Sequence, residues 1–295
     1  MKIARLLTAS AAVLCAFTVT PAHAAALSFV QNFGSFGSGS GQFNTPTGVT
    51  VDSAGNVYVN EYQNKRIDRF NPADFAGTFT TFGSAGSGSG QFTSPSGVTV
   101  DSGGNVYVAD SSNNRIDRFN PTDFAGTFTS FGSNGSGSGQ FNLPRAITFD
   151  SAGNLYVADS NNNRIVRFNP ADFAGTFTSF GFFGSGSGQF NDPLGVTVDS
   201  AGKIYVGDFG NDRIDSFDPA NFGGTFASFG SLGSGSGQLD GPQGVTVDSA
   251  GNLFVADVHN HRIVELTGAA PAPEPTSAAL LFGGGALLAL RRRRG

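Results

Sequence analysis

The stretch Asp110-Ser-Ser-Asn-Asn-Arg115 holds residue types that catalysis and ion binding use: an acid, two amides and an arginine. A carboxylate beside an arginine can hold an ion, orient a substrate or serve as a general base. However, an acid followed by asparagine at the third position and arginine at the fifth occurs five times, beginning at Glu61, Asp110, Asp159, Asp208 and Asp257. A catalytic group is normally needed once, so the repetition favours a structural role.

We therefore expect each of these polar trios to act as a brace. The acid would accept backbone N–H groups of its loop, and the planar guanidinium would tie that loop to a carboxylate or carbonyl nearby. The expected braces pair Glu61 with Arg66, Asp110 with Arg115, Asp159 with Arg164, Asp208 with Arg213, and Asp257 with Arg262.

The trios belong to a 49-residue repeat, because other landmarks recur at the same interval. These are the motif Gly-Ser-Gly-Ser-Gly-Gln and the acids Asp52, Asp101, Asp150, Asp199 and Asp248. Each copy holds four β-branched and aromatic runs, which in the second copy are residues 97–100, 105–109, 115–119 and 127–131. Four strands per repeat, separated by Gly, Asn, Asp and Pro, predict an all-β propeller of five four-stranded blades over residues 25–267.

The two ends of the repeat array predict how the ring closes. The last copy lacks its fourth run after Leu266, whereas residues 29–34 align with the fourth run at residues 78–83. We therefore expect the N-terminal segment to complete the fifth blade. A closed ring has no long exposed sheet edge.

The repeats resemble the NHL family through the stretch "SPSGVTVDSGGNVYVADSSNNRIDRF" at residues 94–119 and its copies. The resemblance implies a β-propeller. It departs from the usual pattern in the length of the repeat and in having five copies, where six are commoner. Some NHL-like propellers act as lyases or hydrolases at the channel mouth, and some animal NHL proteins bind RNA through a basic face.

The N-terminus is typical of an export signal. Lys2 and Arg5 precede an apolar segment, and residues 22–24 (Ala-His-Ala) match a cleavage site, so we expect a signal peptide over residues 1–24. The one cysteine, Cys15, lies inside it. We therefore expect no disulfide in the mature protein.

The C-terminus carries a second targeting pattern. A Pro-rich linker, residues 268–275, precedes residues 276–295, which hold an apolar run and then four arginines. Pro273-Glu274-Pro275 with this tail resembles the PEP-CTERM sorting signal, which implies an exosortase-type membrane enzyme as a partner. We expect transient anchoring in the inner membrane and delivery to the cell envelope, cell surface or extracellular matrix, and a plain C-terminal anchor is the alternative.

The charge of the remaining body excludes one class of partner. Without both targeting segments, 11 Lys and Arg face 21 Asp and Glu, a net charge of −10. Nucleic-acid binding depends on basic residues that displace counterions from phosphates, so we expect no nucleic-acid partner.

A binding surface is expected where the copies differ. The residue after the repeat's proline changes in every copy: Thr47, Ser96, Arg145, Leu194 and Gln243. The loop between the second and third strands also differs, with Tyr62, Phe209 and His259 among its members. Both segments should lie on one face, around the mouth of the central channel, where loops on a rigid scaffold commonly carry recognition. Arg145 is the one cation among the five mouth positions, and neutral drift at exposed positions is the alternative.

No metal or other cofactor is expected. The Asp-Ser-Ala-Gly-Asn loops lack the alternating acids of a calcium loop, and His259 with His261 offers too few donors for a closed zinc site. We expect a non-catalytic binding or scaffold protein that presents one face to a glycan or protein. The alternative is an extracellular propeller lyase or hydrolase with its site at the channel mouth.

Overall fold

The structure, a computed structural model, describes residues 30–268. The predicted signal peptide and tail lie outside the described residues, as does the linker except for Gly268. All the sheets belong to the compact unit that begins at Phe33. Within residues 30–268, no helix has the length and apolar character needed to cross a bilayer.

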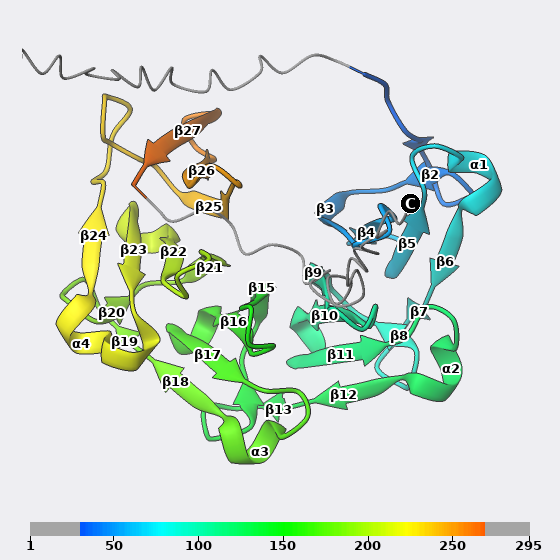
Figure 1. The fold of residues 1–295 in the computed structure, drawn as a ribbon, viewed down its shortest axis with the longest axis horizontal. Helices are drawn as coiled ribbons and strands as arrows, with labels where there is room; N and C mark the ends of the chain where they lie inside the picture. Colours follow the sequence, from blue (N-terminus) through cyan, green and yellow to red (C-terminus); the bar gives the residue numbers. More distant parts are fainter. Residues whose placement is uncertain (1–29, 269–295) are drawn as a thin grey trace, which may run out of the picture. The chain divides into compact units, whose positions relative to one another are not determined.

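Five antiparallel sheets follow one another along the chain and form the blades of a β-propeller (Figure 1). In the described residues, blades 1 to 4 have four strands each and blade 5 has three. The strands are β3 (Pro46–Val51), β4 (Val57–Glu61), β5 (Arg66–Phe70) and β6 (Thr80–Phe82) in blade 1; β9 (Pro95–Val100), β10 (Val106–Asp110), β11 (Arg115–Phe119) and β12 (Thr129–Phe131) in blade 2; β15 (Pro144–Phe149), β16 (Leu155–Asp159), β17 (Arg164–Phe168) and β18 (Thr178–Phe180) in blade 3; β21 (Pro193–Val198), β22 (Ile204–Asp208), β23 (Arg213–Phe217) and β24 (Ala227–Phe229) in blade 4; and β25 (Pro242–Val247), β26 (Asn252–Asp257) and β27 (Arg262–Thr267) in blade 5.

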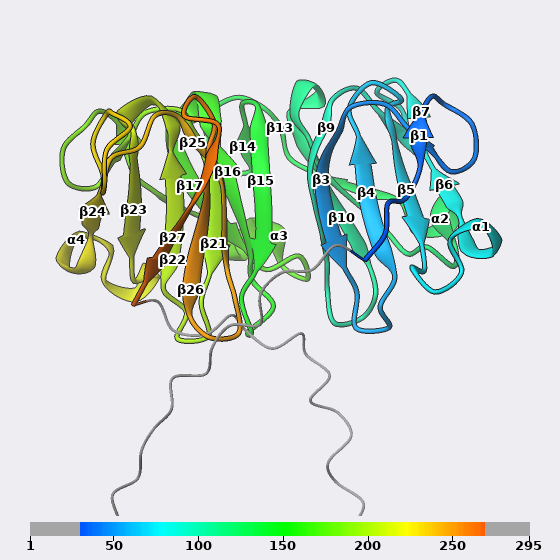
Figure 2. The same cartoon turned by 90° about the horizontal axis from the view of Figure 1, so that it is seen from above.

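The connections repeat as regularly as the strands, and Figure 2 shows the strands running between two faces of this unit. The third and fourth strands are joined by one helical turn, which in blade 2 begins where Asp123 accepts a hydrogen bond from the N–H of Gly126 (3.0 Å). These turns are α1 (Phe75–Thr78), α2 (Phe124–Thr127), α3 (Phe173–Thr176) and α4 (Phe222–Thr225), with the 3₁₀ turn η4 (Pro219–Asn221) before α4. The second and third strands are joined by the 3₁₀ turns η1 (Ser111–Asn113), η2 (Ser160–Asn162) and η3 (Phe209–Asn211) in blades 2 to 4. Before each of the first four blades, two-residue strands pair in parallel: β1 (Ser35–Phe36) with β2 (Gln42–Phe43), β7 (Ser84–Ala85) with β8 (Gln91–Phe92), β13 (Ser133–Asn134) with β14 (Gln140–Phe141), and β19 (Phe182–Phe183) with β20 (Gln189–Phe190).

The core lies between consecutive blades, because both sides of an interior sheet are covered. The first strands pack in series, β3 on β9, β9 on β15, β15 on β21 and β21 on β25. Further out, Phe119 of blade 2 contacts Phe124 (ring centroids 4.8 Å apart) and Phe82 of blade 1 (5.2 Å). Phe119 is fully buried. The abundant phenylalanines therefore join each blade to the next.

The predicted closing strand is the part of the fold that the described residues do not form. β27 pairs with β26 alone, and residues 30–34 contain no strand. The first strands of blades 5 and 1 do not pack as the other neighbours do, so the start of the unit is not brought alongside β27. Phe33 nevertheless contacts Phe70 (5.0 Å) and Phe75 (5.3 Å) of blade 1, as Phe82 contacts the equivalent pair in blade 2. Phe33 thus makes the contact with blade 1, but its segment does not pair with blade 5.

The sides of blades 1 and 5 that lack a neighbouring blade are exposed as a result. Val49 is 67% exposed, whereas its counterpart Val98 is 7% exposed. Ile263 is 66% exposed, whereas its counterpart Ile116 is fully buried. Surfaces that join blades in the interior of the array are therefore open to solvent at its two ends.

Glycine after the variable mouth residue of blade 4 allows its first strand to pack closely on that of blade 5. A Cβ atom on Gly195 would lie 2.3 Å from the carbonyl oxygen of Gln243 in the next blade. Blade 3 has Ala146 at this position, so its spacing from blade 4 accommodates a methyl group. Gly195→Ala is expected to lower the free energy of unfolding by about 1–3 kcal/mol, because the neighbouring strand must move.

Thermal and urea unfolding would measure this effect, and Gly244→Ala is the matched control. A Cβ there would meet the Cβ of Ala256 at 3.6 Å, an ordinary contact. Equal losses of stability in the two variants would contradict the close-packing explanation.

Candidate binding face and the polar trios

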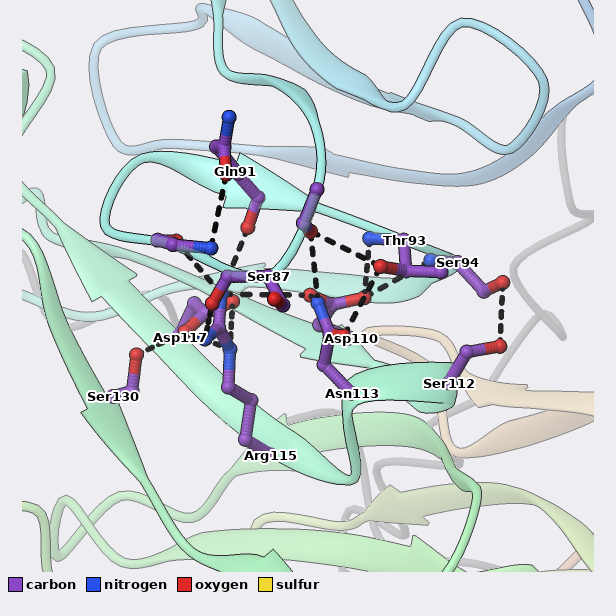
Figure 3. Close-up of polar contacts among 12 residues, drawn as sticks. Ser87, Gln91, Thr93, Ser94, Asp110, Ser112, Asn113, Arg115, Asp117 and Ser130 are labelled. Carbon is purple, nitrogen blue, oxygen red and sulfur yellow. Dashed lines mark hydrogen bonds and ion pairs between the residues drawn. The ribbon is translucent and has the colours of Figure 1, made fainter.

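Each polar trio joins the loop between the second and third strands to the loop that precedes the first strand of the same blade, and Figure 3 shows the trio of blade 2. In blade 2, Asp110 Oδ1 accepts hydrogen bonds from the N–H groups of Thr93 (2.9 Å) and Ser94 (3.0 Å). Asn113 Nδ2 donates to Asp110 Oδ2 (2.5 Å) and to the carbonyl of Gly86 (3.0 Å). The acid and amide therefore hold both loops.

The arginine completes each trio by donating to carbonyl groups. Arg115 Nη1 donates to the carbonyl of Ser87 (2.6 Å), and Nη2 donates to the carbonyl of Gln91 (2.8 Å). The same arginine lies 3.7 Å from Asp110, and in the five blades the acid and arginine are separated by 2.8 Å (Glu61–Arg66), 3.7 Å (Asp110–Arg115), 2.8 Å (Asp159–Arg164), 3.2 Å (Asp208–Arg213) and 2.7 Å (Asp257–Arg262). The acids are fully buried and bonded to the chain itself, which supports the proposed structural role.

A second buried acid joins the trio in three blades, which the sequence reasoning missed. Asp68, Asp117 and Asp215 each contact the arginine of their trio, whereas blades 3 and 5 have Val166 and Val264 there. Burial raises the pKa of Asp117 to about 7, opposed by hydrogen bonding from Ser130 and by the charge of Arg115. Burial likewise raises the pKa of Asp68 and of Asp215. The sequence signal for this second acid was that one repeat position holds Asp in three copies and Val in the other two.

On the opposite face, the acids of the loops that join the first and second strands bond to their own turns, as in Asp101-Ser-Gly-Gly-Asn105 of blade 2. Asp101 Oδ1 accepts from the N–H groups of Gly103 (2.9 Å) and Asn105 (2.8 Å), and Oδ2 accepts from Asn105 Nδ2 (2.9 Å) and Tyr107 OH (3.3 Å). These carboxylates stabilise tight turns. Among residues 30–268, no three His, Cys, Asp or Glu side chains are grouped so that they could hold a metal ion.

The five variable mouth positions line one cavity of about 860 Å³ at the end of the channel. Its lining includes Thr47, Ser96, Arg145, Leu194 and Gln243, one from each blade, together with Tyr62. Lys65 Nζ lies 4.2 Å from the centre of the Tyr62 ring and fixes this side chain beside the mouth. The structure therefore brings together six of the eight predicted binding residues.

Phe209 and His259 lie outside that cavity and contact each other instead, with ring centroids 5.4 Å apart. His259 Nδ1 is 2.7 Å from Asp240 Oδ1, and both side chains are partly exposed. Equivalent positions in blade 3 hold Asn161 and Asn142, which are joined at 3.3 Å. In blade 5 a histidine and a carboxylate therefore make the contact between loops that two asparagines make in blade 3.

Two further features of the channel and the variable face were missed. Five threonines line both the mouth cavity and a second cavity of about 620 Å³ that opens on the opposite face: Thr50, Thr99, Thr148, Thr197 and Thr246. A polar residue recurring inside an otherwise apolar first strand was the signal. In addition, Phe182 and Phe183 are exposed beside the Gly-Ser-rich loop before blade 4. The other four copies have a serine at the position of Phe182.

Comparison with known families identifies the repeat. The model of the NHL repeat matches residues 92–119, 141–168, 190–214 and 239–266. These four segments are NHL repeats. Each NHL match begins at the aromatic or leucine residue that precedes the first strand and extends into the third strand, so it contains the polar trio. Among curated proteins, none matches the chain significantly.

Solved structures with a similar fold include both enzymes and binding proteins. A catalytically inactive variant of virginiamycin B lyase from Staphylococcus aureus, with quinupristin, has a TM-score of 0.58 and 20% identity, over 80% of this chain and 71% of that chain. A streptogramin B lyase has a TM-score of 0.58 and 19% identity, over 79% and 70%. A nidogen/laminin complex has a TM-score of 0.59 and 21% identity, over 76% of each chain. At these identities the likeness shows the fold, and the function has to be argued from the site.

Proposed function

We propose that this NHL-repeat propeller is an exported, non-catalytic binding or scaffold protein. It would be held at the cell surface or in exopolysaccharide, and its variable face would bind a glycan or a protein. One observation carries the proposal: the five residues that follow the repeat's proline, which differ in every blade, line a single cavity, whereas the polar trios bond to the chain itself.

The binding role can be tested by adding the same charges to each channel mouth. Leu194→Glu with Gln243→Glu would place two carboxylates at the variable mouth, and Ser102→Glu with Ser151→Glu would place two at the opposite cavity. We expect the first variant to lose the envelope or matrix material that copurifies with the mature protein, and the second to retain it. Loss of the copurifying material in the second variant alone would indicate that the binding site lies on the opposite face.

Export and sorting rest on the two terminal sequence patterns and need their own experiment. Cells that produce the full chain would be fractionated beside cells whose protein lacks residues 271–295. A matched variant would replace only Pro273, Glu274 and Pro275 with alanine. Exosortase-type processing requires the short motif, so both changes should leave the protein out of the surface fraction. Correct sorting of the alanine variant would favour a plain anchor.

A second function, as a lyase or hydrolase, is favoured by the pair of His259 and Asp240. An acceptor on one ring nitrogen orients the imidazole, and the other nitrogen can then act as a general base. The mature protein would be incubated with quinupristin and with oligosaccharides, and the products identified by mass spectrometry. A product formed by the protein but not by His259→Ala would establish the enzyme and overturn the non-catalytic proposal.

A further inference from the structure

Arg145 differs from the five arginines of the polar trios in having free donors. It follows Pro144 in β15 and lines the mouth cavity. Among residues 30–268, no ion pair or hydrogen bond to its side chain is formed, and its Nε atom is buried without an acceptor. Arg164 of the same blade, by contrast, binds Asp159 and the carbonyls of Ser136 and Gln140. Because protein atoms cover the Nε atom, a ligand in the cavity would be held by the Nη groups, for which no acceptor is found among residues 30–268.

Asp192 does not satisfy this group. Asp192, in the loop before blade 4, is partly buried, which raises its pKa, and the charge of Arg145 opposes that shift. Among residues 30–268, no ion pair joins the two side chains. The planar fork of Arg145 therefore remains available for two parallel bonds to a carboxylate.

The rest of the mouth selects a ligand with sparse negative charge and many hydroxyl groups. Thr47, Ser96 and Gln243 offer neutral donors and acceptors, and Leu194 is the one apolar side chain among the five mouth positions. A densely charged polyanion would be repelled by a body with a net charge of −10. A single cation among hydroxyl and amide groups matches a sugar that carries one carboxylate.

We infer that the channel mouth binds an acidic polysaccharide through the carboxylate of a uronic acid residue, which is held by Arg145. The hydroxyl groups of the same and adjoining sugars bond to Thr47, Ser96 and Gln243. This inference rests on the proposed function, and it adds the chemical class of the ligand and the residue that recognises it.

Calorimetric titration of the mature protein tests the inference with two matched trisaccharides: maltotriose, and maltotriose in which one glucose is replaced by glucuronic acid. We expect the uronic acid trisaccharide to bind and maltotriose to bind at least about tenfold more weakly, since a charge-assisted pair is worth about a factor of ten or more. Arg145→Ser, which introduces the residue of blade 2, should lose the same factor with an unchanged melting temperature. Lys203→Gln, which removes a cation from the opposite face, should bind as the unaltered protein does.

A variant with the opposite effect gives an independent check. Asp192→Asn removes a negative charge near Arg145 that would repel the carboxylate of the ligand, and asparagine tolerates the positive φ of 51° at this position. We expect this variant to bind the uronic acid trisaccharide more tightly.

The outcomes separate the two proposals. Equal binding of maltotriose, or unchanged affinity in Arg145→Ser, would overturn the uronate assignment while leaving a binding mouth in place. Preference for a sulfated trisaccharide or for a glutamate-rich peptide would also overturn it. If no glycan or peptide binds and the glutamate variants of the mouth retain all copurifying material, the proposed function itself fails.

Discussion

Asp159→Ala is expected to lower the free energy of unfolding by about 3–5 kcal/mol, because it leaves a buried guanidinium without its carboxylate. Asp159 is fully buried and accepts hydrogen bonds from the N–H of Asn142 (2.7 Å), Asn162 Nδ2 (2.8 Å) and Arg164 Nε (2.8 Å). Blade 3 is also covered by a neighbour on each side, so water cannot easily replace the lost group. Urea unfolding at constant pH measures the change.

Asp257→Ala in blade 5 is the matched control. Its partner Arg262 is 33% exposed, compared with 10% for Arg164, so solvent can compensate for part of the loss. We expect a clearly smaller effect there. If both substitutions cost less than about 1 kcal/mol while binding is lost, the trios are functional sites and the brace assignment is wrong.

Asp117→Val is expected to gain stability relative to the unaltered protein as the pH rises through about 7, because the buried carboxyl of Asp117 then has to ionise inside the protein and valine does not. The same substitution takes from Arg115 the carboxylate that lies 2.9 Å away, so we expect it to lower stability below pH 4. Blade 3 already has the fully buried Val166 at this position. Since burial raises the pKa of Asp117 to about 7, the folded state keeps a proton that the unfolded chain loses near its ordinary value of 3.8. The contribution of Asp117 to stability is therefore greatest below pH 4 and declines as the pH rises through about 7.

The measurement is the melting temperature between pH 5 and pH 8. The unaltered protein should become less stable over this range, and Asp117→Val should flatten part of that slope, so that its melting temperature relative to the unaltered protein is highest at pH 8. Asp117→Asn, which keeps hydrogen-bonding groups but cannot ionise, should flatten the slope in the same way. A slope unchanged in both variants would show that Asp117 is ionised throughout and held by Arg115 and Ser130.

Much of the fold was predictable because the same pattern of strand and turn residues recurs in five repeats. In blade 2 the predicted runs at residues 97–100 and 115–119 match β9 and β11 closely, because β-branched and aromatic residues there alternate with clear turn residues. The fourth run was predicted to begin at Thr127, but that residue ends α2, which Asp123 caps. A four-residue helix contains too few residues for its periodicity to be visible in the sequence.

The candidate site was predictable where strand direction alone decides position. Thr47, Ser96, Arg145, Leu194 and Gln243 follow a proline at the start of each first strand, so alternating strand directions bring them to one cavity. Phe209 and His259 were placed with them, but their loops pack on each other further from the cavity. The proximity of Asp117 to Arg115 could have been anticipated from their spacing of two residues in one strand, which places both side chains on one side of the sheet.

The braces also have a consequence for how this architecture can change. Each one acts inside a single blade, and the contacts between blades repeat along the array. A duplication or deletion of one 49-residue unit would therefore preserve every type of stabilising contact while altering how many inner strands encircle the axis. The width of the central channel therefore depends on the number of repeats, and it can change in evolution without any new side-chain chemistry.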